Sequence, residues 1–190
     1  MSSQIGEPAP GSIAVGSLAQ AKRHKRRFDA VITLEDPHAR QNLRLRFGGK
    51  PAPAHLVLTF EDVDVTSLGI RVATLEEVRE AIEFARFHVE GSILVHCFHG
   101  VGRSAAIALA IIADRLGPGA EREALDRLLA VRPEATPNLV VVELADQILQ
   151  RSGHLVAVLA AWEATVPRLE VARAARLKLA QTHPELYARI

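Results

Sequence analysis

The chain has 190 residues, of which 48% are hydrophobic and 24% are charged, and its formal net charge is +1. This composition can build a sizeable core, so it excludes a wholly disordered or collagen-like chain, and the near-zero charge excludes a global electrostatic footprint for nucleic acid. No apolar stretch reaches the roughly 18 residues that a membrane-spanning helix needs, and the first residues carry neither the basic nor the apolar region of a secretory signal.

The first sixty residues show the patterns of strands. Short apolar blocks at residues 12–18 and 28–34 predict an edge strand and a buried strand. The basic stretch at 19–27 between them suits a short helix, and its cations are expected to form a solvated helix face. Leucine or phenylalanine alternates with arginine at 43–47, the period-2 pattern of a half-exposed strand, and residues 55–60 predict a further strand.

The rest of the chain is predicted to be helical around one central strand. Thr74 is a good N-cap and Glu77 completes a capping box, so a helix should begin there. The continuous apolar run at 92–96 is expected of a strand that is covered on both faces. Helical patterns follow at 74–89, 103–116, 120–131 and from Pro137 to about Ser152, and then through the tail at 154–190 with breaks at Pro167 and Pro184.

Strands followed by helices, with one strand–loop–helix unit in the middle, predict an α/β fold. We expect a central mixed, largely parallel sheet flanked by helices in three layers, with a helical C-terminal tail. The expected organisation is a flexible N-terminus at 1–11, one globular domain at 12–152, and a helical extension at 153–190 that packs on the domain or trails it.

The strand–loop–helix unit carries the only cysteine of the chain. Cys97 follows the strand, Arg103 lies six positions further at the start of a buried helix, and Gly100 and Gly102 allow a tight turn between them. Successive N–H groups in such a loop form a concave site for a tetrahedral oxyanion, and Arg103 can hold two of its oxygens. The same field favours the thiolate of Cys97, which would be a nucleophile directed at phosphorus.

Phosphoryl transfer also needs a proton for the leaving oxygen. Residues 60–64 follow a predicted strand and precede a flexible segment, so they can reach over the loop. Strand alternation puts Asp62 on the face of the strand's apolar side chains, and we expect it to be the acid. Asp64 and Glu61 remain alternatives.

Residues 96–104, HCFHGVGRS, resemble the signature of the cysteine-dependent protein tyrosine phosphatase superfamily: His-Cys, five residues, Arg, then Ser or Thr. Over residues 12–152 the order of elements resembles the small dual-specificity branch, particularly its compact bacterial members. Three features depart from that branch. The 35 residues from Asp62 to Cys97 are a few more than is usual, the loop lacks the lysine of phosphoinositide-directed relatives, and Phe98 and His99 are bulky. The chain is also too short for the separate phosphotyrosine-recognition loop of the large tyrosine-specific enzymes, and a shallow pocket is therefore expected.

The resemblance implies a phosphocysteine intermediate on Cys97, phosphate binding by Arg103, and an acid and then base role for Asp62. It implies that Ser104 helps the thiolate leave in the second step. The remaining residues implied are the phosphate-binding loop residues Phe98, His99, Gly100, Val101 and Gly102, and two supporting residues, His96, which orients the loop, and Asn138, which resembles the Asn of the family's Pro-Asn pair.

These observations together predict a metal-independent phosphomonoester hydrolase that acts on a phosphorylated protein or a small phosphoester. No cofactor, metal, nucleic-acid or membrane partner is expected; a monomer is the simplest oligomeric state, and the single cysteine favours a reducing, cytoplasmic setting. Three alternatives stay open. They are a catalytically silent module that binds phosphorylated residues, a phosphatase for a small metabolite, and a rhodanese-like or arsenate-handling enzyme. Cys97 together with an acid argues against the first, and His96 with the Pro137-Asn138 pair argues against the last.

Overall fold

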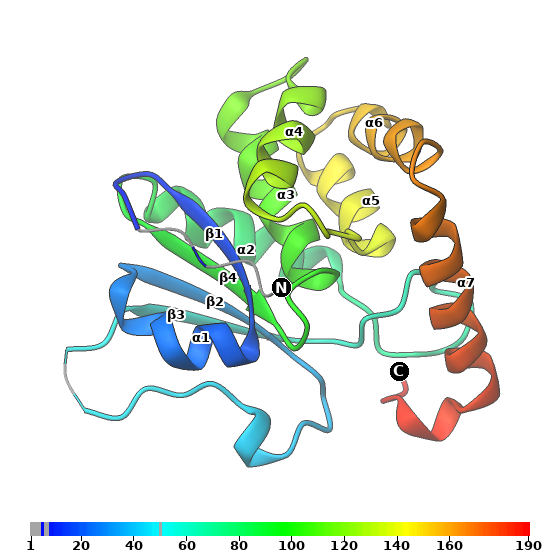
Figure 1. The fold of residues 1–190 in the computed structure, drawn as a ribbon, viewed down its shortest axis with the longest axis horizontal. Helices are drawn as coiled ribbons and strands as arrows, with labels where there is room; N and C mark the ends of the chain where they lie inside the picture. Colours follow the sequence, from blue (N-terminus) through cyan, green and yellow to red (C-terminus); the bar gives the residue numbers. More distant parts are fainter. Residues whose placement is uncertain (1–4, 6–7, 50) are drawn as a thin grey trace.

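Four parallel strands form the centre of the molecule. The computed structural model describes residue 5, residues 8–49 and residues 51–190, so the expected flexible N-terminus lies partly outside the described residues. The sheet order is β1-β4-β2-β3, and every strand pair in it is parallel (Figure 1). The strands are β1 (Ile13–Ser17), β2 (Ala30–Glu35), β3 (Ala54–Thr59) and β4 (Ile93–Cys97). The expected largely parallel sheet is confirmed.

Helices cover both faces of this sheet. The α-helices of the described residues are α1 (Leu18–His24), α2 (Leu75–Phe87), α3 (Arg103–Leu116), α4 (Glu121–Val131), α5 (Leu139–Ile148), α6 (His154–Glu163) and α7 (Pro167–Thr182), with short 3-10 turns at Lys25–Arg27, Gln41–Leu43 and Pro184–Leu186. Figure 1 shows α1 on one face and α2 and α3 on the other, with α4, α5 and α6 outside them. Helix α7 lies on the side toward which the strands point. None of these helices is both long and apolar enough to span a bilayer.

The central strands are buried on both faces because their alternate residues enter different cores. In β2, Ile32 and Leu34 pack into the main core beside α3, whereas Val31 packs with Leu18 and Phe28 beneath α1. Helix α3 lies between the sheet and the outer helices and is buried from its first residue through eleven consecutive positions. The carboxyl ends of β4, β2 and β3 therefore meet at one edge, where α3 begins.

The strand expected at residues 43–47 is wrong. This segment is irregular after a 3-10 turn, and the carbonyls of Leu45 and Arg46 accept hydrogen bonds from the side chains of Arg46 and Lys25. Lys22, Lys25 and Arg26 donate hydrogen bonds to carbonyl oxygens in and around the segment. The alternating pattern arises from Leu45, which is buried in the core beneath α1. The basic run is thus largely exposed, as expected, and three of its side chains also form hydrogen bonds with the backbone of the loop that follows β2.

The C-terminal extension packs on the rest of the molecule. In α6, Leu155 and Leu159 are part of the main core. Ala180 of α7 lies in a separate apolar cluster with Val63 and Val140. The boundary expected at residue 152 stays a prediction, but the helices beyond it supply buried residues to two cores.

Candidate active site

The cysteine lies at the turn from β4 to α3. Sγ of Cys97 accepts the main-chain N–H of Gly100 at 3.2 Å and lies 3.2 Å from Oγ of Ser104. The side chain of Cys97 is buried. A sulfur anion gains from both contacts, because each can present a hydrogen that carries partial positive charge. The structure therefore brings together three of the residues that the sequence placed in the site.

The main-chain carbonyls of the loop between Cys97 and Arg103 point outward. Their partners are the N–H of Leu18 for Phe98 (3.1 Å), the guanidinium of Arg132 for His99 (3.3 Å), the N–H of Thr136 for Val101 (2.8 Å) and the N–H of Asn138 for Gly102 (3.3 Å). A planar trans peptide points its N–H away from its C=O. The N–H groups of residues 99, 100, 102 and 103 are therefore directed toward the inside of the loop, which makes a concave lining suited to an anion.

Gly100 permits this shape because of its backbone and its surroundings. Its φ is +78°, in the region that favours glycine, and a Cβ there would lie 2.4 Å from the carbonyl carbon of Gly16. The loop consequently rests directly on the end of β1, which is paired with β4. A side chain at this position would push the loop away from the sheet.

Arg103 is buried under the same loop. Its Nη1 donates to the carbonyl of Phe60 at 2.6 Å, and its Nη2 forms an ion pair with Asp36 at 2.8 Å. Burial alone would lower the pKa of Arg103, but the negative groups Cys97, Asp62 and Asp36 outweigh it and raise that pKa. Nε is buried and has no hydrogen-bond partner among the described residues. An oxyanion held in the loop would satisfy this donor.

His96 lies on the face of the sheet opposite Cys97. Its Nε2 is 2.8 Å from Oγ1 of Thr33, which is also 2.8 Å from Nε2 of His55. Burial lowers the pKa of His96 from 6.5 to about 3, so the imidazole is neutral at physiological pH. His96 can therefore orient the end of β4, but it does not exchange protons at neutral pH.

The carboxylate of Asp62 rests on the phosphate-binding loop. A Cβ built on Gly102 would lie 2.3 Å from Oδ2 of Asp62, so only glycine leaves room for this approach. Oδ1 of Asp62 accepts Nδ2 of Asn138 at 3.0 Å. Asn138 also caps α5 by accepting the N–H of Val141 at 3.1 Å. Asn138, which is buried, thus connects Asp62 to the start of α5.

Asp64, the alternative acid, is engaged on both oxygens. Oδ1 accepts the N–H of Leu139 at 3.0 Å and pairs with Arg173 at 2.9 Å, while Oδ2 pairs with Arg176 at 3.1 Å. These contacts tie Asp64 to the start of α5 and to α7, which is an anchoring arrangement.

Glu61 is engaged elsewhere. It is buried and accepts the N–H of Ala188 at 2.9 Å, and burial raises the pKa of its carboxyl. Of the three carboxylates considered from the sequence, Asp62 is the one with an oxygen that rests against the phosphate-binding loop.

The rim of the loop carries two aromatic rings. Phe98 is 41% exposed and meets His99 edge to face at a centroid distance of 4.8 Å. They are available to contact a substrate at the mouth of the loop. Across the part of the chain that the structure describes, no group of three His, Cys, Asp or Glu side chains is arranged to hold a metal ion.

Sequence reasoning missed five residues around the site: Asp36, Thr33, His55, Arg173 and Arg176. Asp36 directly follows β2, at the carboxyl end of a parallel strand where ligands of open α/β sheets bind, and that position could have identified it. The two arginines lie three residues apart on one predicted helix and so share a face, which is a weaker signal.

No family model matches the chain, and no curated protein matches it. Solved structures do. A mouse putative dual specificity phosphatase, crystallised with zinc tungstate, is 20% identical over 80% of this chain and 91% of its own, with a TM-score of 0.56. The human tyrosine phosphatase-like serine/threonine/tyrosine-interacting protein is 19% identical over 72% and 90%, with a TM-score of 0.55. PTPMT1 in complex with PI(5)P is 19% identical over 77% and 99%, with a TM-score of 0.53.

At such identities the likeness shows the fold. The chain has the phosphatase-like α/β fold that the sequence predicted, with a four-stranded parallel sheet between helices.

Proposed function

We propose that this chain, which has the fold of the dual-specificity phosphatases, is a cysteine-dependent phosphomonoester hydrolase that acts on phosphorylated protein. The observation that carries the proposal is the loop after β4. Its carbonyls are bonded outward, its N–H groups are directed inward, and a cysteine sulfur accepts one of them. Beside the loop lies a buried guanidinium nitrogen that has no partner in the described part of the chain. That combination suits a tetrahedral dianion with a nucleophile beneath it.

In the proposed first step, the loop N–H groups and Arg103 hold the non-bridging oxygens of the phosphate. Sγ of Cys97 attacks phosphorus, the bond to the leaving oxygen breaks, and that oxygen takes the proton from Oδ2 of Asp62. The products are a phosphocysteine and the free alcohol or phenol, so atoms and charge balance.

In the second step, Asp62 accepts a proton from water as the water oxygen attacks phosphorus. The P–S bond breaks, inorganic phosphate leaves, and Oγ of Ser104, 3.2 Å from the sulfur, donates a hydrogen bond to the departing thiolate. Because Cys97 is the single cysteine of the chain, we also propose a reducing, cytoplasmic location, where the thiolate survives.

The test is hydrolysis of an aryl phosphate without added metal and with a chelator present. We expect wild-type turnover, loss of turnover in Cys97→Ser, and a fall of about 10²-fold or more in Asp62→Asn with phosphate-analogue binding retained. Asp64→Asn is the matched control, and an equal or larger loss there would assign the acid to Asp64. Activity that a chelator abolishes and Cys97→Ser does not would overturn the mechanism.

The same assay distinguishes the hydrolase from a catalytically silent binding module. Such a module would bind a phosphotyrosine peptide with no turnover, and it would have no use for a carboxylate over the loop. Phosphotyrosine, phosphoserine, phosphoinositide and nucleotide substrates then separate tyrosine from dual specificity and protein from small phosphoester.

A further inference from the structure

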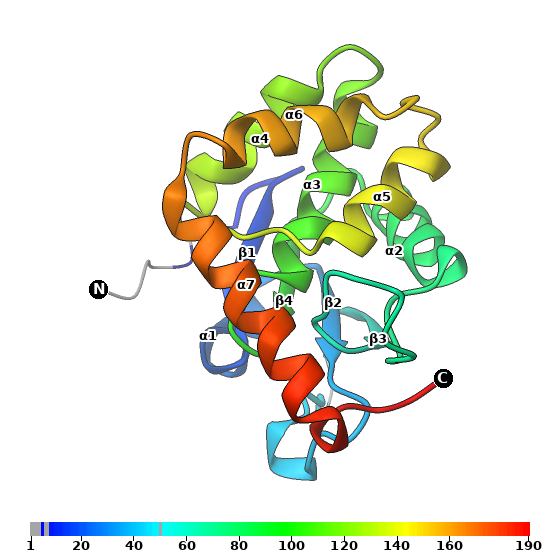
Figure 2. The same cartoon turned by 90° about the vertical axis from the view of Figure 1, so that its right-hand side faces the viewer.

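The segment that carries Asp62 is built onto the C-terminal end of the chain. Residues 61–72, here called the acid loop, run between β3 and α2 and lie beside α7 and the residues after it (Figure 2). The N–H of Arg71 donates to the carbonyl of Ala188 at 2.9 Å, and the N–H of Ile190 donates to the carbonyl of Gly69 at 3.2 Å. The acid loop therefore has main-chain partners about 120 residues further along the sequence.

Helix α7 adds charge to the backbone contacts that the residues after it make. Nη1 of Arg176 lies 3.4 Å from Oδ1 of Asp62 and 3.1 Å from Oδ2 of Asp64, so one guanidinium bridges the two carboxylates. Asn138 donates to the same Oδ1 of Asp62. Both donors thus fall on one oxygen, and the other oxygen, Oδ2, lies nearer to Gly102: an added Cβ there would be 2.3 Å from Oδ2 and 2.8 Å from Oδ1.

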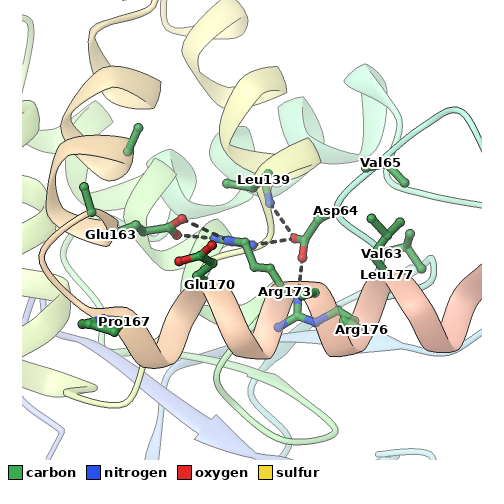
Figure 3. A pocket seen from close by; sticks show the side chains of 13 residues that line it. Val63, Asp64, Val65, Leu139, Glu163, Pro167, Glu170, Arg173, Arg176 and Leu177 are labelled. Atoms are coloured by element: carbon green, nitrogen blue, oxygen red, sulfur yellow. Dashed lines mark hydrogen bonds and ion pairs between the residues drawn. The ribbon is translucent and has the colours of Figure 1, made fainter.

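Arg173, one turn before Arg176 on α7, holds Asp64, the second carboxylate that Arg176 contacts. Figure 3 shows Arg173 between the carboxylates of Glu163 and Asp64, with Arg176 reaching the other oxygen of Asp64. Arg173 also donates to the carbonyl of Pro137 at 2.9 Å. Asp64 balances the charge of Arg176, and Arg173 and the N–H of a residue in α5 hold Asp64 in turn.

A pocket of about 620 Å³ borders this arrangement, so packed hydrocarbon does not surround it on every side. The pocket is lined by Asp64, Arg173 and Arg176 together with apolar residues of α5, α6 and α7. Where side chains face open space, hydrogen bonds and ion pairs set their orientation rather than steric contact. The paired groups are mostly buried, which makes their interaction stronger than that of a surface pair.

We propose that Arg176 is a positioning residue of the hydrolase: it holds Oδ1 of Asp62 so that Oδ2 faces the phosphate-binding loop. The inference rests on the proposed function, and it means that α7 contributes a residue that positions the acid. Arg176 touches no reacting atom in this scheme. Its effect passes entirely through Asp62.

The test uses two aryl phosphates that differ in their need for the acid. p-Nitrophenolate leaves readily without a proton, whereas phenolate, the leaving group of phenyl phosphate, is more basic and needs one. We compare kcat/KM, which reports the steps up to P–O cleavage, for the wild type, Arg176→Ala and Arg176→Lys. The matched control is Lys178→Ala, which removes an exposed cation two residues along the same helix.

For Arg176→Ala we expect a fall of about 10-fold or more in kcat/KM with phenyl phosphate, a clearly smaller fall with p-nitrophenyl phosphate, and unchanged inhibition by vanadate. Arg176→Lys should recover part of the loss, and Lys178→Ala should match the wild type. Equal losses on both substrates, or no loss, would overturn the proposal.

A second measurement does not depend on turnover. Amide hydrogen exchange in residues 61–65 should be faster in Arg176→Ala than in the wild type and unchanged in Lys178→Ala, and unchanged exchange in both variants would count against positioning. If the wild type hydrolyses neither ester, the proposed function fails, while the exchange result still decides whether Arg176 holds the acid loop.

Discussion

The two halves of the candidate site are built in different ways. The phosphate-binding loop lies within nine consecutive residues, 96–104, between a buried strand and a buried helix. The acid loop takes its position from the start of α5, from α7 and from the last residues of the chain. The first half is therefore specified locally and the second by contacts between distant segments. Substitutions in the first should change chemistry directly, and those in the second should act through the placement of Asp62.

The largest effect is expected in the local half. Arg103→Lys keeps the charge but removes the fork of donors, including the buried Nε that lacks a partner. We expect kcat/KM to fall by about 10³-fold, the upper range for the loss of one preorganised donor. Steady-state kinetics with vanadate inhibition measures this, and vanadate should also bind more weakly. An active lysine variant would show that the guanidinium geometry is unimportant here.

The next effect concerns the pH dependence of stability. In the folded protein the pKa of His96 is lowered to about 3 from 6.5, so between these values the unfolded chain binds a proton that the folded chain does not. Stability contributed in this way is present at neutral pH and is lost as the pH falls. We expect the wild type to lose about 3 kcal/mol more than His96→Gln between pH 7 and pH 4, as measured by urea unfolding. Parallel pH profiles would contradict a buried neutral imidazole.

Gly102 is the point at which the two halves touch. In Gly102→Ala the new Cβ would overlap the carboxylate of Asp62, so the acid must move. A displacement of about 1 Å can reduce turnover about 10²-fold. The matched control is Gly48→Ala, where an added Cβ meets nothing. If Gly102→Ala keeps full activity with phenyl phosphate, the acid does not work from the position seen here.

The smallest of these effects separates two roles of Asn138. Asn138→Ser keeps a side-chain oxygen that can cap α5 but loses the amide that donates to Asp62. We expect a loss of turnover of about 10-fold, since Arg176 still holds the same oxygen. Thermal stability should fall modestly, because the variant also loses the buried hydrogen bond from Nδ2 of Asn138 to the carbonyl of Val63. A variant that is fully active per folded molecule would show that the amide of Asn138 does not help to place Asp62.

The sequence predicted most of the fold because the signals were local. The capping box of Thr74 and Glu77 gave the start of α2, and the apolar run that ends at Gly117 gave both ends of α3. The alternation at 43–47 misled because one buried leucine, Leu45, lies between two arginines, and this arrangement has the same sequence pattern as a half-exposed strand.

The candidate site divides along the same line. Cys97 and Arg103 follow from their spacing, and Ser104 from the resemblance to the phosphatase signature. The pairing of Arg176 with Asp62 joins residues 114 positions apart and leaves no periodic trace in the sequence. Strand alternation placed Asp62 on the apolar face of the strand, a face that Asp64 shares, and the contacts of the two residues now give a physical reason to prefer Asp62. Their roles in catalysis stay predictions until the variants are measured.

The hydrogen bond from Ile190 to Gly69 has a practical consequence. A purification tag or fusion partner joined after Ile190 would pull on the backbone of the segment that carries Asp62, the proposed general acid. Protein prepared in this way would show weakened turnover on esters with poor leaving groups while still binding oxyanions normally. Handles attached at the opposite terminus leave that hydrogen bond untouched and are the safer choice for enzymology.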